Sequence, residues 1–304
     1  MSRHLIFVLC GCLLGFSGFA QQNNNDLVQS EKELSLLLNN IVASQSVSKS
    51  DSLNDIFTKE FKKALSIDGA LKYPFDSLKQ VGKLFSPDSN LRIFTWNIPQ
   101  AGGLQCYYGF VLVRTQNGVV VLHQLTDSRS DKSIDVHHAQ LSDDKWLGAL
   151  YYNLISVEGE GYYILFGYDY NNLFSSKKII EVLSVKPDGN ISFGLPVFSV
   201  DNKYVLSRIV FEFNVQSRFT LQYLGDDKMI IFDHLSPIKS EFAGDPQFYG
   251  PDGSFDGFKF EKGKWTYVRD LDLRNPQRDK PKPVQAPETD KEPGFLYKPM
   301  KVLK

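Results

Sequence analysis

Apolar residues recur with a period of two from about Val81 to about Leu273, and this pattern constrains the fold more than any other feature. A period of two places alternate side chains on opposite faces of a β-strand. Short segments rich in glycine and aspartate separate the apolar runs, and such short loops join antiparallel neighbours. The pattern predicts about eleven strands, at 91–96, 106–115, 119–124, 147–157, 162–168, 177–185, 204–213, 219–224, 228–232, 254–260 and 265–268.

The turns between these runs indicate hairpins. Asn117-Gly118 is the strongest signal and predicts a type I′ turn, in which both residues take a positive φ. So many strands must protect their edges by packing two sheets together or by curling. We therefore predict a mainly β domain at 81–273, an antiparallel meander that forms a sandwich or a curled, barrel-like open sheet.

The first twenty residues have the pattern of a secretory signal peptide. A short positive start precedes an apolar run at 5–16, and Gly18-Phe19-Ala20 offers a cleavage site. Twelve helical residues span about 18 Å, less than the roughly 30 Å core of a bilayer. We expect export to the periplasm or the outer cell surface, with no transmembrane helix after cleavage. Lipid attachment at Cys12, in Leu9-Cys10-Gly11-Cys12, is the alternative to cleavage after Ala20.

Residues 21–80 predict a polar leader and a helical section. Apolar residues at helical spacing indicate helices at 27–42 and 52–67, the second starting at a Ser52–Asp55 capping box and stopping near Gly69. Its apolar stripe consists of Leu53, Ile56, Phe57, Phe61, Ala64 and Leu65. We expect the helices to cover one face of the β-domain, with a partner-binding amphipathic helix as the alternative. Residues 274–304 are rich in proline and charge and predict a largely disordered tail.

The sequence carries few signs of catalytic or cofactor chemistry. The chain has 34 Lys and Arg against 35 Asp and Glu, so it lacks the positive charge that binding to nucleic acid requires. It contains no G-x-S-x-G, H-E-x-x-H, P-loop or paired C-x-x-C motif. Signal cleavage would leave Cys106 as the only cysteine, and we expect it to be a buried apolar side chain. We assign no catalytic, cofactor-binding or metal-ligating residue and expect no cofactor.

Three weak constellations remain. Residues 127–144 hold several aspartates and histidines, of which Asp135 and His137 would face the same way in an extended chain; we interpret this stretch as a solvated loop, with a metal site as the alternative. Asp252–Gly257 resembles the opening of a calcium loop but lacks its glutamate, so we interpret it as a turn that starts a hairpin. The third consists of tyrosine doublets that would form a binding face if one ring of each is exposed: Tyr107-Tyr108, Tyr151-Tyr152 and Tyr162-Tyr163.

Three short segments carry a resemblance to a group of known proteins. Gly18–Gln22 is similar to the ends of signal peptides in Bacteroidota, and Leu91–Asn97 and Gly263–Val268 resemble segments of uncharacterised exported β-rich proteins from that phylum. The likeness covers roughly residues 81–275. It implies export and a β fold, and no known activity, so no site residue follows from it.

These observations favour an exported, non-enzymatic β-domain that acts by binding, as an accessory subunit of a cell-envelope assembly. Its expected partner is an envelope protein or a glycan. One alternative is a hydrolase acting on glycan or peptide through an aspartate pair or a loop-held metal. Two carboxylates converging in a pocket would favour that alternative. A purely structural spacer domain is the other.

Overall fold

The computed structural model describes residues 4–201 and 203–272, with the backbone alone for residues 4–20. Residues up to Leu271 form one compact unit, and a second unit begins at Asp272. The tail predicted at 274–304 therefore lies outside the described residues. None of the described helices is both long enough and apolar enough to cross a membrane.

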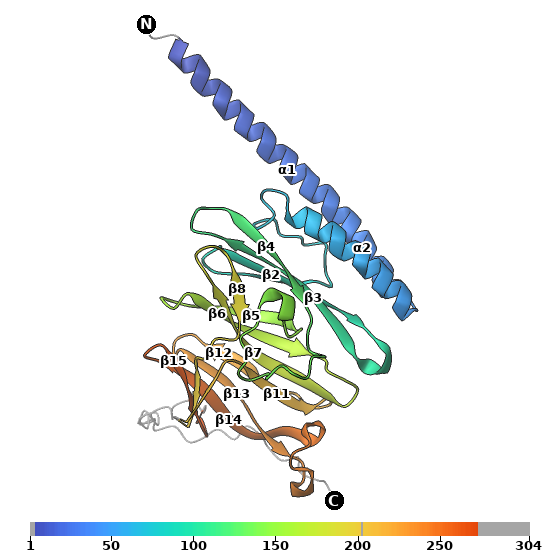
Figure 1. The fold of residues 1–304 in the computed structure, drawn as a ribbon, viewed down its shortest axis with the longest axis vertical. Helices are drawn as coiled ribbons and strands as arrows, with labels where there is room; N and C mark the ends of the chain where they lie inside the picture. Colours follow the sequence, from blue (N-terminus) through green and yellow to red (C-terminus); the bar gives the residue numbers. More distant parts are fainter. Residues whose placement is uncertain (1–3, 202, 273–304) are drawn as a thin grey trace, which may run out of the picture. The chain divides into compact units, whose positions relative to one another are not determined.

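The chain is mainly β, as predicted, and begins with two helices, α1 (His4–Ala43) and α2 (Val47–Leu65) (Figure 1). The described strands form three sheets. The first sheet runs in the order β1 (Gly82–Phe85), β2 (Leu91–Pro99), β3 (Gln105–Arg114), β4 (Val120–Thr126). The second runs in the order β11 (Ile209–Asn214), β7 (Ser175–Val185), β6 (Tyr162–Asp169), β5 (Leu150–Val157), with β8 (Ile191–Phe193) beside β7. The third runs in the order β10 (Tyr204–Leu206), β9 (Phe198–Val200), β15 (Lys264–Val268), β14 (Tyr249–Glu261), β13 (Met229–Pro237), β12 (Leu221–Leu224).

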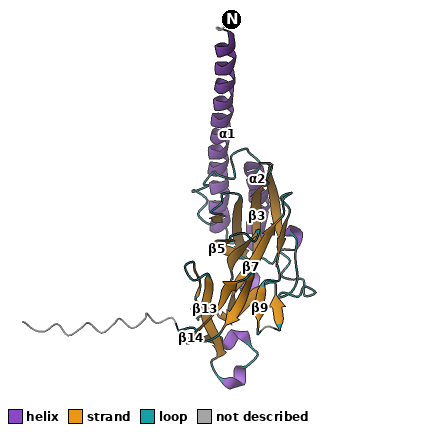
Figure 2. Cartoon of the chain, turned by 90° about the vertical axis from the view of Figure 1, so that its left-hand side faces the viewer, coloured by secondary structure: helices purple, strands orange, loops and turns teal. Residues whose placement is uncertain are grey.

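The helices and the three sheets lie in successive layers (Figures 1 and 2). Three clusters of buried apolar side chains fill the spaces between these layers. The first joins both helices to one face of the first sheet, where Phe61 meets Phe94 and Phe110 edge to face. The second fills the space between the first and second sheets, and the third lies between the second and third sheets. Central strands such as β2 and β6 are therefore buried on both faces. This explains why their sequences are nearly continuous apolar runs instead of clean alternations.

The helices lie where the sequence predicts them, with different ends. Helix α1 includes the predicted 27–42 helix and also residues 21–25, which the sequence indicated as a leader. Helix α2 begins earlier than the predicted Ser52, because Ser46 has extended backbone and its side chain accepts a 3.4 Å hydrogen bond from the Lys49 N–H. Ser52 lies inside the helix and donates to the Ser48 carbonyl instead. Ile56, assigned to the apolar stripe, is exposed.

The strand pairing departs from a simple meander in two places. Strand β11 pairs with β7 across the intervening β8–β10, and β9 runs parallel to β15. The predicted 204–213 strand is in fact two strands in different sheets, because the chain passes from the third sheet to the second at Ser207 and Arg208. Strands β1, β8 and β9 were not predicted; each has only three or four residues, too few to show a period.

The Asn117-Gly118 turn joins β3 to β4 as predicted but has another geometry. Only Gly118 of this pair has a positive φ, at 81°. The Gly118 N–H donates to the Thr115 carbonyl, and the Thr115 N–H donates to the Val119 carbonyl. The type I′ prediction is therefore wrong: a turn with one left-handed glycine at its end closes this hairpin.

Candidate functional site

A pocket of about 620 Å³ lies at one end of the space between the first and second sheets. Its lining comes from the loop between β2 and β3 with the start of β3, the loop after β4, the end of β6 with the residues after it, and strands β7 and β11. Apolar side chains, among them Leu147, Ile179 and Val210, share this lining with charged ones. Volumes of this order are typical of small-molecule sites, which are mostly apolar with a few placed polar groups.

Two paired strands form the floor of the pocket. In their register Ile179 of β7 lies opposite Val210 of β11, and Lys177 lies opposite Glu212. One step further along, Arg208 forms an ion pair with Glu181. Since residues two apart share one face of a strand, the floor presents the Lys177 cation, the apolar Ile179–Val210 pair and the Arg208 cation in sequence, and each cation is paired with a carboxylate beside the lining.

The two ion pairs of the floor differ in burial. The Lys177 ammonium lies 3.5 Å from Glu212, and both side chains are more than a quarter exposed. The Arg208 and Glu181 side chains are 0% and 1% exposed. Burial raises the pKa of Glu181, opposed by the charge and hydrogen bond of Arg208. Solvent exposure therefore falls along the floor, from partly exposed side chains at Lys177 to fully buried ones at Arg208.

Arg208 also holds the loop that covers this buried end of the floor. Its Nη1 donates a 2.7 Å hydrogen bond to the Val136 carbonyl, and the preceding Ser207 N–H donates to the His137 carbonyl at 2.8 Å. Val136 itself lines the pocket. The loop at 134–139, which the sequence indicated as solvated, is thus held to the segment just before β11 by hydrogen bonds that its backbone carbonyls accept.

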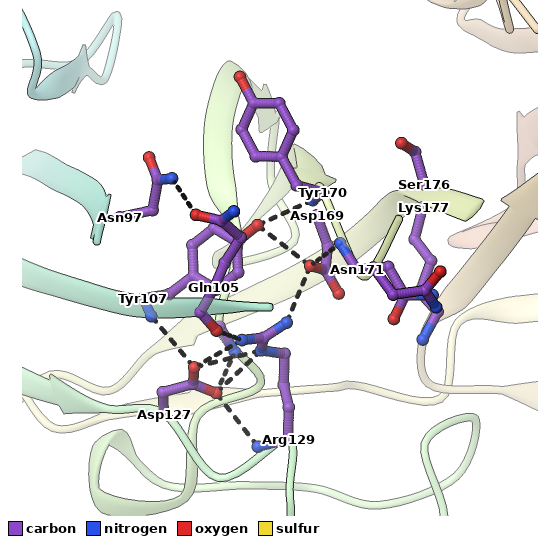
Figure 3. Close-up of polar contacts among 12 residues, drawn as sticks. Asn97, Gln105, Tyr107, Asp127, Arg129, Asp169, Tyr170, Asn171, Ser176 and Lys177 are labelled. Atoms are coloured by element: carbon purple, nitrogen blue, oxygen red, sulfur yellow. Dashed lines mark hydrogen bonds and ion pairs between the residues drawn. The ribbon is translucent and has the colours of Figure 1, made fainter. Parts of the chain in front are cut away.

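A second network closes the pocket on the side of the first sheet (Figure 3). Arg129 lies between two carboxylates: its Nη2 is 2.9 Å from Asp127 and its Nη1 is 2.8 Å from Asp169. Arg129 Nη2 also donates to the Gln105 carbonyl at 2.6 Å. Burial alone would lower the pKa of Arg129, but hydrogen bonds and charges from the two aspartates raise it above its ordinary value. Three segments that are distant in sequence meet on this one guanidinium.

The 127–144 constellation does not assemble as a cluster. Asp135 accepts a 3.0 Å hydrogen bond from His138 and a backbone bond from the His137 N–H, so the Asp135–His137 side-chain pair of the alternative interpretation, a metal site, does not form. His123 is buried in a different place, between Asp143 and the Gly189 carbonyl. Among the described residues, no group of three or more His, Cys, Asp or Glu side chains has the arrangement of a metal site.

The Asp252–Gly257 segment lies inside β14, where residues 252–254 form a bulge, so the predicted hairpin-starting turn is wrong. Asp233 pairs with Phe255 and Leu235 with Pro251, which leaves three residues of β14 opposite His234 alone. His234 Nδ1 lies 2.7 Å from Asp256 Oδ2, and the same oxygen accepts a 2.6 Å hydrogen bond from the Tyr267 hydroxyl. The aspartate at 256 therefore fixes the bulge.

The tyrosine doublets bridge layers and do not form one exposed face. Both rings of Tyr162-Tyr163 are buried, in different clusters, and Tyr108 stacks on Trp96. Tyr152 alone among the six is exposed. Cys106 was expected to be buried; it is half-buried and lines the pocket, where burial raises its pKa.

The residues that form the pocket were not identified from the sequence. Asp127 was noticed only as part of the polar loop, and Arg129, Asp169, Lys177 and Arg208 were not singled out. Two signals were available: charged residues at two-residue spacing around Ile179, and an arginine inside the apolar run at 204–213. Comparison of the chain with protein-family models, with curated proteins and with solved structures gives no match.

Proposed function

We propose that this chain is an exported, non-enzymatic binding protein and that it holds a small molecule in the pocket between the first and second sheets. One observation carries the proposal: the pocket combines an apolar floor at Ile179 and Val210 with charged groups that rigid strands hold in place. Such a combination supplies binding energy from the apolar area and orientation from the charges.

The carboxylates beside the pocket support binding over hydrolysis. A general acid or base must exchange a proton with the substrate. Asp127 accepts hydrogen bonds from Arg129 and from three backbone N–H groups, those of Tyr107, Arg129 and Gly148. Asp169 Oδ1 accepts three hydrogen bonds, among them those from Tyr107 and Arg129. Both groups act as fixed acceptors that hold the walls of the pocket together.

A thermal-shift screen of residues 21–304 with small apolar and amphipathic compounds tests this proposal, with Val210→Phe as the matched variant. Val210 is half-buried in the floor, so phenylalanine fills the pocket from there. We expect hits that raise the melting temperature of the original protein and not that of the variant. If no compound stabilises the protein, or if the variant responds equally, the proposal is wrong. Turnover of nitrophenyl esters or glycosides that Asp169→Asn abolishes would favour the hydrolase instead.

In this proposal the protein works in the cell envelope as an accessory subunit, and the expected partner is an envelope protein or glycan. The signal-peptide pattern at 1–20 supports export. With Cys106 as the only cysteine after cleavage, the apolar clusters and not an internal disulfide hold the domain together. Co-purification from native membranes, with and without residues 274–304, tests this part. Recovery of no partner by either form would favour the spacer alternative.

A further inference from the structure

The charge that faces the pocket is mainly positive. Of the described residues that line it, Arg129, Lys177 and Arg208 are cationic and only Asp169 is anionic. The other acidic partners of these cations, which stand outside the lining, are Asp127, Glu181 and Glu212. A molecule in the pocket therefore meets the cations more directly than their counter-ions. Because attraction between opposite charges is stronger where solvent is partly excluded, an anionic group on the molecule is favoured there.

Two cations on this lining, Lys177 and Arg208, have hydrogen-bond donors that the described residues leave unsatisfied. Glu212 Oε1 already accepts from Asn171 at 3.0 Å and from Ser175 at 2.5 Å, while Lys177 has, among the described residues, only the 3.5 Å contact with Glu212 Oε2. The Arg208 guanidinium, fully buried, has one nitrogen, Nη2, without a partner. Lys177 thus keeps donor capacity toward the pocket.

The rest of the surface favours an apolar body. Ile179 and Val210 separate the two ion pairs of the floor, and Leu147 lies among the same lining residues. Leu104 lines the pocket and is exposed at its rim. Leu173, also exposed, approaches the adjacent Gly103 so closely that a side chain there would collide with it. An apolar chain could leave the pocket across this rim without meeting a charge.

We propose that the ligand is a single-chain amphiphile with a monoanionic headgroup; this deepens the proposed function and rests on it. The headgroup accepts hydrogen bonds from the Lys177 ammonium, and the chain lies over Ile179 and Val210. Charge-assisted hydrogen bonds are about twice as strong as neutral ones, so the headgroup orients the ligand. The apolar floor supplies most of the affinity.

Three probes with one chain length and different headgroups test the inference: decanoate, decan-1-ol and decyltrimethylammonium. Each is titrated below its micelle concentration into residues 21–304 by calorimetry at pH 7.5 and low salt. We expect decanoate to bind about tenfold more tightly than decan-1-ol, as one charge-assisted bond implies. Decyltrimethylammonium should bind more weakly than both, and decyl sulfate should compete with decanoate at the same site.

Lys177→Gln should weaken decanoate binding about tenfold and leave decan-1-ol binding unchanged, whereas Lys177→Arg should retain it. Lys259→Gln is the matched control, because Lys259 lies on β14 and pairs with Glu261 away from the pocket. Val210→Thr, which keeps the shape but adds a hydroxyl, should weaken all three probes.

The outcomes separate the two proposals. If decanoate and decan-1-ol bind equally, or if Lys177→Gln behaves like Lys259→Gln, the anionic headgroup is wrong while the binding pocket stands. If none of the probes binds and Val210→Phe changes nothing in the compound screen, both the inference and the proposed function are wrong. Stronger binding of decyltrimethylammonium would overturn the inference by itself.

Discussion

The Tyr107 hydroxyl donates a 3.0 Å hydrogen bond to Asp169 and thereby joins the first sheet to the second. The same hydroxyl accepts a 2.8 Å bond from the Tyr170 N–H. The Arg129 guanidinium lies over the Tyr107 ring, 4.3 Å from its centre. Burial and the neighbouring Asp169 raise the pKa of Tyr107, so the hydroxyl stays protonated as a donor. One buried side chain thus fixes the two sheets beside the pocket.

Replacing Tyr107 by phenylalanine should lower the free energy of unfolding by about 1–3 kcal/mol, because Asp169 and the Tyr170 N–H each lose a buried partner. Urea denaturation at neutral pH measures this. Tyr204→Phe removes an exposed hydroxyl on β10 and should change stability by less than about 0.5 kcal/mol. Equal effects of the two substitutions would show that the Tyr107 hydroxyl does not tie the sheets together.

Arg129→Met should be far more damaging, by about 3–5 kcal/mol, because it leaves Asp127 and Asp169 as partly buried carboxylates without their shared cation. The loss should shrink when Asp127→Asn and Asp169→Asn are added, since neutral amides need no counter-ion. Arg218→Met, at an exposed position, is the control. A triple variant no more stable than Arg129→Met alone would contradict the electrostatic account.

The buried Glu181–Arg208 pair gives a different expectation. Glu181→Leu alone should destabilise the fold by about 3–5 kcal/mol, because it leaves the Arg208 charge buried without its counter-ion. The double variant Glu181→Leu/Arg208→Met should recover most of this loss, as buried ion pairs are often no better than apolar residues of similar size. Denaturation of the two single variants and the double variant gives the coupling energy directly. Additive effects would contradict the prediction.

The fold class could be read from the sequence because it depends on local signals. Hairpin turns and short apolar runs, alternating or continuous, located β2 to β7 and β11 to β15, and the helical stripe located Phe57 and Phe61 in the first core. The sequence of a strand that is buried on both faces does not indicate which sheet the strand joins. A stack of three sheets could therefore not be distinguished from a sandwich of two. The parallel contact of β9 with β15 depends on three-residue strands that carry no periodicity.

The pocket was beyond sequence reasoning for a related reason. Arg129 and Asp169 are 40 residues apart and meet only because two sheets pack against each other. In the sequence each is one charged residue near a turn, where charges are ordinary. Arg208 is a charge inside an apolar run, a signal that was not used, and that position is where the chain changes sheets.

Gly194 and Gly253 allow a matched test of close packing. Both have a positive φ, of 84° and 93°, so alanine is strained at each by about 1–2 kcal/mol. A side chain at Gly194 would also lie 2.5 Å from the Ala139 carbonyl oxygen and 3.1 Å from Arg208 Nη2, whereas nothing lies within 4 Å at Gly253. Gly194→Ala should therefore lower the melting temperature clearly more than Gly253→Ala. Equal losses in melting temperature would mean that the loop at 134–139 moves to accommodate the added methyl group at no cost in stability.

The His234–Asp256 pair should make stability depend on pH. The hydrogen bond that His234 donates to Asp256 raises the pKa of His234 above 6.5. Burial alone would raise the pKa of Asp256, but the same hydrogen bond lowers it below 3.8. A raised histidine pKa gives stability that is complete below about pH 6.5 and is lost as pH rises through the folded-state pKa. The lowered pKa of Asp256 gives stability that is present above about pH 3.8 and is lost in stronger acid.

The original protein should therefore exceed His234→Gln in stability most at pH 5–6, and the difference should disappear by about pH 9. Because the His234 side chain is 45% exposed, solvent screening limits the difference to about 0.5 kcal/mol. Asp252, Asp270 and Tyr267 also face this histidine, and Asp256→Asn is the variant that isolates the pair. In Asp256→Asn the histidine ring protons should titrate at lower pH by nuclear magnetic resonance. A titration midpoint that Asp256→Asn does not move would show that other charges set the protonation of His234.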